Sequence, residues 1–295
     1  MVGSDGALVA SFGDIDRPFY LRSSAKPFQA TISQESGADL RPLEMAMACA
    51  SHRGFPVHIA LVASILQGAS IDESALGCPP DWPLASSARD LVLRSGAPGK
   101  RRIWHNCSGK HAAFLRACVG SGWPLDSYLS PDHPLQRRII DFATELGEHP
   151  AEPVGVDGCG APTLRTNTRA MGLMFARLAT ESRLRSAFDA MHRYPALVGA
   201  NGECDTEIAI ATNSVAKGGA AGCLGVAVEG RFGIAVKSWD GLVPVAGIGA
   251  VETMTQLGEL TATGFEALEP VRRPAVLGGG VPVGGFEPRL TLEPA

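Results

Sequence analysis

The hydrophobic pattern of the chain changes twice, from short apolar runs to helical spacing and back to short apolar runs. Residues 6–12 and 17–21 are short and apolar, and a turn containing glycine and aspartate separates them, so we predict two strands joined as a hairpin. From Pro27 to about Arg193, apolar residues recur at helical intervals. This spacing predicts helices that include residues 56–67, 111–118, 135–146 and 168–179.

The clearest hairpin lies near the C-terminus. Residues 223–228 and 231–236 are apolar and are joined by Glu229 and Gly230, and a helix is predicted from about Val243 to Leu257. Strands from both chain ends around a helical middle segment predict an α+β fold with one antiparallel sheet. We therefore expect a single domain over residues 1–277, followed by an extended or mobile Gly/Pro-rich tail over residues 278–295.

Composition and charge narrow the classes of function. Only 19% of the 295 residues are charged, below the roughly 25% usual for soluble domains, so we expect a surface shared with a second copy in a homodimer. The net charge of −4 and the lack of a basic block argue against nucleic acid as a partner. No apolar run is long enough to span a membrane, and no basic leader precedes the first strand. Seven cysteines without a CxxC pair indicate a reducing compartment, so we expect a cytoplasmic protein.

The stretch RSSAKPFQA, residues 22–30, contains the first candidate chemistry. It places Ser23 three positions before Lys26, which predicts that the two side chains share a helix face and hydrogen-bond, while Pro27 is tolerated in the first helical turn. A buried lysine with a lowered pKa can take the proton of a serine hydroxyl, and the positive end of a helix favours the alkoxide. The spacing by itself is equally consistent with an exposed helix start.

Ser214 and Lys217 repeat this spacing and act as an internal control. They lie in a stretch that we predict to be a strand, where residues three apart point to opposite faces. We therefore expect no cooperation between them.

Two further polar residues strengthen the interpretation of Ser23 and Lys26 as catalytic residues. Ser51, in ASHRG, follows a predicted helix and offers a second hydroxyl. Lys237 ends the strand of residues 231–236, on the face that carries only Gly233 and Ala235, and we expect this face to be open to a substrate. An exposed lysine at a strand end is the alternative reading.

Two cysteines lie in polar, glycine-rich surroundings. Cys107 is in HNCSGKHAAF and Cys159 is in GVDGCGAPT, unlike structural cysteines in apolar runs. Together with Lys110, and with His105 or His111 nearby, they could hold a metal, although two thiols about fifty residues apart are a weak signal.

Seven motifs in order together resemble one family. The motifs are RSSAKPFQA, ASHRG, HNCSGKHA, DHPLQR, GVDGCGAPT, KGGAAG and VKSWDG. From about Gly6 to Leu257 the chain is similar to the L-asparaginase II family, the rhizobial-type asparaginases with a serine β-lactamase-like fold. The resemblance implies an amidohydrolase that converts L-asparagine and water to L-aspartate and ammonia without an organic cofactor.

The resemblance also implies roles for individual residues. Two Ser-Lys pairs would be catalytic, with Ser23 as the nucleophile, and the four residues are Ser23 with Lys26 and Ser51 with Lys237. Arg22 and Asp157 would bind the α-carboxylate and α-amino groups of the substrate, with His111 and Cys223 lining the pocket. Cys107, Lys110 and Cys159 would hold zinc, more weakly as the pH falls because the lysine ligand must be neutral.

Three departures from the family pattern keep alternatives open. Relatives begin about twenty residues earlier, so we expect one strand of their sheet to be absent here. Glu203 stands where they have arginine, and Ala221 where they have glutamate. A degenerate member that binds an amino acid or zinc without catalysis is therefore one alternative. A Ser-Lys hydrolase acting on another amide is the other, although it predicts an S-D-N triplet that the chain lacks.

Overall fold

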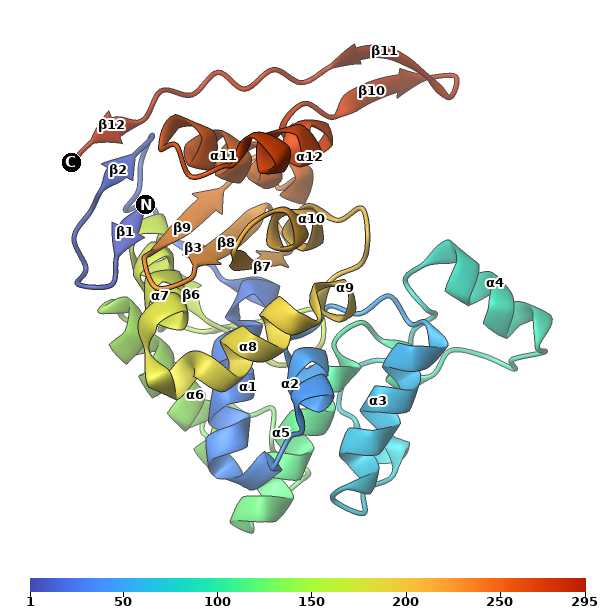
Figure 1. Cartoon of the computed structure of the whole chain (residues 1–295). Coiled ribbons are helices and arrows are strands. Elements are labelled where there is room, and N and C mark those ends of the chain that lie inside the picture. The colour runs from blue at the N-terminus through green and yellow to red at the C-terminus, as the bar shows by residue number, and fades with distance from the viewer.

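A four-stranded antiparallel sheet forms the centre of the molecule. The computed structural model describes residues 1–295. The strands run in the order β1 (Val2–Gly3), β9 (Phe232–Lys237), β8 (Cys223–Val228) and β7 (Ser214–Gly219). The predicted C-terminal hairpin is therefore confirmed as β8 and β9. Figure 1 shows the sheet between a small helical layer and a larger helical body, so the protein is a mixed α and β structure.

The two faces of the sheet contact different cores because side chains alternate along a strand. On β8, Leu224 and Val226 face a smaller core of 12 buried residues, against α10 (Cys204–Ala211), α11 (Val243–Gln256) and α12 (Ala262–Arg272). Cys223 and Ala227 face the main core of 53 buried residues. The sheet thus separates two hydrophobic clusters.

The predicted helical middle segment is confirmed. Each of the four apolar-periodic stretches forms a helix, and α11 follows the hairpin as expected. The helices of this segment are α1 (Lys26–Ser33), α2 (Pro42–Cys49), α3 (Pro56–Gln67), α4 (Ser86–Arg94), α5 (Ser108–Ser121), α6 (Pro134–Gly147), α7 (Thr168–Thr180), α8 (Arg185–Arg193) and α9 (Pro195–Val198). Helix α4 stands apart from the others at the edge of the molecule (Figure 1).

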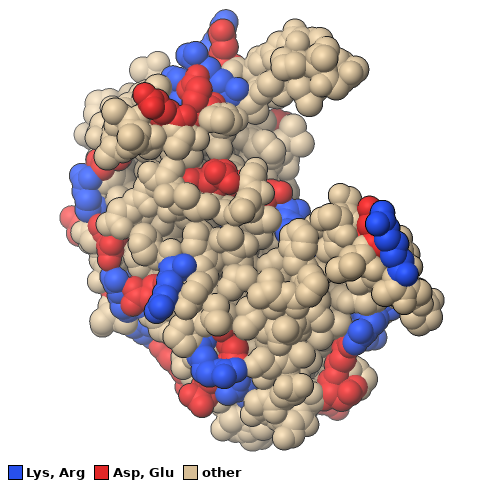
Figure 2. Space-filling view, turned by 45° about the vertical axis from the view of Figure 1, so that its right-hand side comes forward, with Lys and Arg blue, Asp and Glu red and all other residues tan.

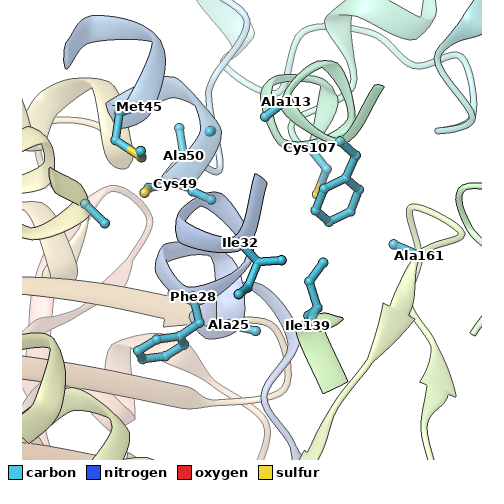
Figure 3. Packing of buried hydrophobic residues seen from close by; sticks show 14 of the residues in the cluster. Ala25, Phe28, Ile32, Met45, Cys49, Ala50, Cys107, Ala113, Ile139 and Ala161 are labelled. Carbon is cyan, nitrogen blue, oxygen red and sulfur yellow. The ribbon is translucent and has the colours of Figure 1, made fainter. Parts of the chain in front are cut away.

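Helix α1 runs through the middle of the main core. All eight of its residues are buried, and its polar Thr31 and Ser33 satisfy their hydroxyl groups by bonding to carbonyls four residues earlier. In Figure 3, Phe28 points towards the sheet and Ile32 points away from it, with Cys49 on one side and Cys107 on the other. Because α1 is enclosed on every side, its first residue, Lys26, is also buried.

The predicted N-terminal hairpin is wrong. Residues 10–11 form β2 and residues 19–20 form β3, but the two strands do not pair with each other. Each short strand finds a distant partner: β2 (Ala10–Ser11) pairs with β12 (Glu293–Pro294), and β3 (Phe19–Tyr20) pairs with β6 (Arg165–Thr166). Two-residue strands carry too little local information to select their partners.

The expectation of an open face beside Gly233 and Ala235 is also wrong. Helix α7 covers this face, and a Cβ atom on Gly233 would collide with the carbonyl oxygen of Gly172. The small residues therefore admit a closely packed helix, not a substrate. Lys237 lies at the end of the strand and is half-buried.

The remaining strands form small two-stranded sheets. β4 (Gly155–Val156) pairs with β5 (Pro162–Thr163), and β10 (Ala275–Gly278) pairs with β11 (Val281–Gly285). The β10–β11 hairpin extends away from the body before the chain returns to β2 (Figure 1). Residues 278–295 thus contain strands as well as extended segments.

Surface charge, cysteine state and helix length complete the description of the fold. Figure 2 shows lysine and arginine next to acidic side chains on this face, without a large block of one sign. All seven cysteines are free and buried. None of the helices is long and apolar enough to cross a bilayer.

Candidate active site

The site forms where one end of the sheet meets the turn that precedes α1. Gly219, Cys223 and Lys237 lie side by side at this end, because the strand register pairs Cys223 with each of the other two. The Cys223 thiol donates to the carbonyl of Leu21 at 3.2 Å, and Gly219 lies so close that a Cβ would be 3.0 Å from the amide nitrogen of Ser24. The sheet therefore fixes the segment that carries Ser23.

Ser23 occupies the first turn of a helical segment. The segment η1 (Arg22–Ala25) is a 3-10 turn that leads directly into α1, with Pro27 in the first turn of α1 as predicted. Arg22, immediately before Ser23, has a φ of 51°, in the left-handed region that non-glycine residues seldom adopt. The Ser23 side chain is half-buried at this sharp change of direction.

Lys26 makes a different contact from the one its spacing predicts. Its Nζ donates to the hydroxyl of Ser51 at 3.0 Å and to the carbonyl of Ala50 at 2.6 Å, and it makes no hydrogen bond to Ser23. Burial lowers the pKa of Lys26, and the positive charges of Lys217 and Lys110 lower it further, against the opposing charge of Cys107. At a given pH, more of the Lys26 amine next to the Ser51 hydroxyl is therefore neutral than in an exposed lysine.

Ser51 and Lys237, expected as a second pair, are not hydrogen-bonded to each other. Ser51 is held by its backbone N–H, which donates to Val198 at 2.9 Å. Lys237 donates to the carbonyls of Ala221 and Ser238, each at 2.6 Å. Partial burial lowers the pKa of Lys237. Its amine therefore lies on the strand end next to Cys223, while Ser51 belongs to the Lys26 side of the site.

Sequence reasoning missed the part played by Lys217. As predicted, it does not cooperate with Ser214: Ser214 bonds Thr212, and the Lys217 amine pairs with Asp205 at 3.3 Å. Both members of this ion pair are buried, and the charge of Lys217 is one of those that lower the pKa of Lys26. A lysine in an otherwise apolar strand is the signal that could have identified it.

Arg22 and Asp157, which the resemblance assigns to substrate binding, are paired with each other. The Arg22 guanidinium donates to Oδ1 of Asp157 at 2.8 Å, and the Arg22 backbone N–H donates to Thr163 at 3.2 Å. Asp157 lies in the tight turn between β4 and β5, where its carbonyl accepts from Gly160. The turn thereby presents a carboxylate beside a cation on η1.

His111 and Cys223, the expected pocket-lining residues, are both fully buried. His111 lies on α5, and its Nδ1 is 2.6 Å from the hydroxyl of Tyr128. Its other ring nitrogen has no hydrogen-bond partner. Cys223 lies next to Ser24, with 3.6 Å between the sulfur and the hydroxyl.

The three expected metal ligands converge. Lys110 Nζ donates to the sulfur of Cys159 at 3.3 Å, and Cys107 lies one helical turn before Lys110, at the start of α5. The Cys159 side chain lowers the pKa of Cys107, and the two cysteines raise the pKa of Lys110 despite its burial. No group of three His, Cys, Asp or Glu side chains is arranged to hold a metal, and the expected ligand set includes a lysine. Two thiols and an amine suit the preference of zinc for sulfur and nitrogen.

The two side-chain departures from the family pattern have local explanations. Glu203 forms an ion pair with Arg53, at a groove of about 520 Å³ between the start of α4 and the segment before α10. Its negative charge is therefore compensated. Ala221 has a φ of 64° and offers its carbonyl to Lys237. Figure 2 shows that the surface is hollowed between two lobes on the side that bears α4.

Comparisons with known proteins identify the family. A family model described as L-asparaginase II matches residues 1–288. No curated protein sequence matches the chain. A solved structure described as "Crystal Structure Analysis of Mglu in its native form" is similar over 83% of this chain, with 15% identity and a TM-score of 0.44. The chain spans 61% of the length of that structure.

Proposed function

Because the chain belongs to the L-asparaginase II family, we propose that it is an amidohydrolase converting L-asparagine and water to L-aspartate and ammonia. The observation that carries this proposal is the buried Lys26 amine, which hydrogen-bonds Ser51. Lys26 itself lies one helical turn after Ser23. A buried amine with a lowered pKa next to hydroxyls is the arrangement required for activating a serine. Structural lysines are rarely fully buried.

In the proposed mechanism, Ser23 is the nucleophile. Lys26 accepts the Ser23 proton through the Ser51 hydroxyl, which is already bonded to its amine, and Ser23 Oγ forms a bond to the amide carbon. The C–N bond then breaks, the nitrogen takes the proton from the Lys26 ammonium and leaves as ammonia, and an ester to Ser23 remains. Water gives a proton to the same amine and attacks the ester carbon. The bond to Ser23 Oγ breaks, Oγ takes that proton back from Lys26, and aspartate is released. Lys237 contributes a second amine at the strand end.

Arg22 and Asp157 supply recognition of the amino acid. The substrate α-carboxylate pairs with the guanidinium of Arg22, and the α-ammonium pairs with Asp157. Two ion pairs with the substrate thus replace the Arg22–Asp157 ion pair of the free protein. His111 and Cys223 bound the same pocket. This arrangement supports a zwitterionic substrate over a neutral amide.

We propose that Cys107, Lys110 and Cys159 hold zinc. The convergence of the three side chains supports this assignment. Bound zinc would supply a positive charge to two thiolates and would link the β4–β5 turn to α5. The residues themselves already place Lys110 and Cys159 in contact.

A serine β-lactamase-like fold and a cytoplasmic location complete the proposal. An antiparallel sheet made from both chain ends, with helices on each face, supports the fold assignment. Seven free thiols support a reducing compartment.

Ammonia release by the purified protein tests the activity. Asparagine should yield ammonia and aspartate, and Ser23→Ala should reduce the rate by several orders of magnitude with the fold intact. Because Ser51 has the direct bond to Lys26, Ser51→Ala is the matched variant. A trapped ester on Ser51 would reassign the nucleophile.

The same assay separates the alternatives. A chromogenic β-lactam cleaved in preference to asparagine would favour a hydrolase for another amide. Binding of asparagine without any ammonia release would favour a member that has lost catalysis. The compensated charge of Glu203 supports retained activity over this last outcome.

A further inference from the structure

His111 has one ring nitrogen with a partner and one without. Nδ1 lies 2.6 Å from the Tyr128 hydroxyl, whereas Nε2 is buried and has no hydrogen-bond partner. A buried polar nitrogen left unpaired destabilises the fold unless a ligand satisfies it. What that ligand must offer depends on whether Nε2 carries a proton.

The Tyr128 hydroxyl determines where the proton lies. It accepts the backbone N–H of Gly77 at 2.7 Å, and its own proton remains to be donated. Tyr128 is only 2% exposed, and His111 Nδ1 is the one remaining partner within hydrogen-bond distance. If Nδ1 carried a proton, the tyrosine proton would face no acceptor in a buried place. The Gly77 N–H therefore donates to the Tyr128 oxygen, and the Tyr128 O–H donates to Nδ1 of His111.

This arrangement leaves the proton of a neutral imidazole on Nε2. The ring is also locked in orientation, since it packs edge-on against Tyr128 at 5.7 Å and at a tilt of 50° against Phe114 at 6.1 Å. Turning it by 180° would replace Nδ1 by a carbon and lose the bond to Tyr128.

We propose that Tyr128 is a positioning residue that holds His111 as a hydrogen-bond donor, and that His111 Nε2–H binds an acceptor oxygen of the ligand. The acceptor is a carboxylate or an amide carbonyl of the amino acid. The identity of the ligand rests on the proposed function, whereas the position of the proton does not. The ring directly follows Lys110 on α5, and the Lys110 amine contacts Cys159.

The first test measures the proton position in the unmodified protein. With ¹⁵N-labelled histidine, long-range ¹H–¹⁵N spectra should show an unprotonated Nδ1 and a protonated Nε2 for His111. His111→Gln identifies the signals by removing them. A protonated Nδ1 would overturn the proposal, whether or not the protein hydrolyses asparagine.

The second test identifies the acceptor. L-alanine offers an α-carboxylate without a side-chain amide, and β-alaninamide offers the amide without the α-carboxylate. A shift of the Nε2–H signal with L-alanine assigns the carboxylate, and a shift with β-alaninamide assigns the amide carbonyl. If neither compound moves the signal at saturating concentration, Nε2–H is not a ligand donor.

The third test removes the tyrosine hydroxyl. Tyr128→Phe should raise the KM for asparagine about tenfold more than it lowers kcat, and should produce a mixture of both ring forms. Tyr194→Phe is the matched control, because its hydroxyl makes no hydrogen bond and it lies outside the site. A folded Tyr128→Phe protein with unchanged KM and unchanged ring signals would contradict the proposal. If this variant does not fold, the spectrum of the unmodified protein decides.

Discussion

Lys26 is the residue whose protonation state controls the proposed chemistry. Its amine is fully buried and has only neutral oxygen partners, Ser51 and the carbonyl of Ala50. No carboxylate compensates a charge at this position directly. Folding therefore shifts Lys26 towards the uncharged amine, which is the form that accepts a proton.

The activity should rise with pH through an apparent pKa below the usual lysine value of about 10.4, because burial lowers the pKa of Lys26. Lys26→Arg should be nearly inactive at every pH, since a guanidinium does not lose its proton in this range. Initial rates of ammonia release across pH measure both. Lys237→Arg is the companion variant, because Lys237 also has a lowered pKa but is half-buried. If both variants keep the parent rate and pH profile, neither lysine is the base.

The residue types of the site could be predicted from the sequence, but their partners could not. The spacing of Ser23 and Lys26 predicts a hydrogen bond between them, whereas the Lys26 amine bonds Ser51, 25 residues later. Ser51 follows α2, a different helix from the one that begins at Lys26. Helical spacing relates residues within one helix, and it carries no information about a partner that another segment supplies.

At the scale of elements, the β4–β5 turn and the start of α5 meet through the proposed zinc ligands. Purified protein should contain zinc, and Cys159→Ser should lose it, because serine replaces a soft sulfur donor by a poor oxygen donor. Metal analysis of both proteins measures the difference. Cys118→Ser is the control, since Cys118 lies on the same helix outside the ligand set. Equal zinc in the parent and Cys159→Ser proteins would reject the site.

Three helices are joined by a single buried carboxylate, Glu44. It lies on α2 and accepts hydrogen bonds from Arg41, from Ser64 on α3 and from Arg116 on α5. Although burial raises the pKa of Glu44, its hydrogen bonds and the arginine charges outweigh this effect and lower the pKa to about 2. The unfolded value is about 4.3, so this stabilisation is present above that pH and is lost as the pH falls towards 2.

Glu44→Gln should therefore lower the free energy of unfolding at neutral pH by about 3 kcal/mol, the loss of charged hydrogen bonds in a buried place. The variant should also lose part of the acid-induced destabilisation of the parent. Urea unfolding at several pH values measures both effects. Glu266→Gln changes an exposed glutamate that forms no ion pair and should behave like the parent. A Glu44→Gln protein as stable as the parent would show that Glu44 does not join the helices energetically.

Helices and hairpins whose hydrophobic pattern lies within one short segment could be predicted from the sequence. Strands that form only by pairing with a distant segment could not. Helices α3, α5, α6 and α7 carry apolar residues at helical spacing, and the β8–β9 hairpin is closed by a local turn. Strands β2 and β3 have two residues each, and their partners lie more than a hundred residues away. Similarly, Gly233 and Ala235 indicated an open face, whereas small residues also allow a helix to pack closely.

At the scale of the whole molecule, several large apolar side chains remain exposed. They include Leu91, Leu242, Leu277, Val281 and Val283. Together with the low charged fraction, they lead us to expect a homodimer. Light scattering after size exclusion should give twice the chain mass of 30.8 kDa. A mass of one chain at micromolar concentration would contradict this expectation.

The rates at which the seven buried thiols are modified measure how often the structure around them opens. A thiol-specific reagent reacts with a buried cysteine only after the surrounding structure opens. Six of the cysteines belong to the main core, and Cys204 is the one in the smaller cluster under α10, α11 and α12. In native buffer, intact-mass spectra should therefore show the addition at Cys204 as a phase separate from the additions at Cys49, Cys78 and Cys118, which lie outside the proposed site. The two rates would give separate opening free energies for the two sides of the sheet.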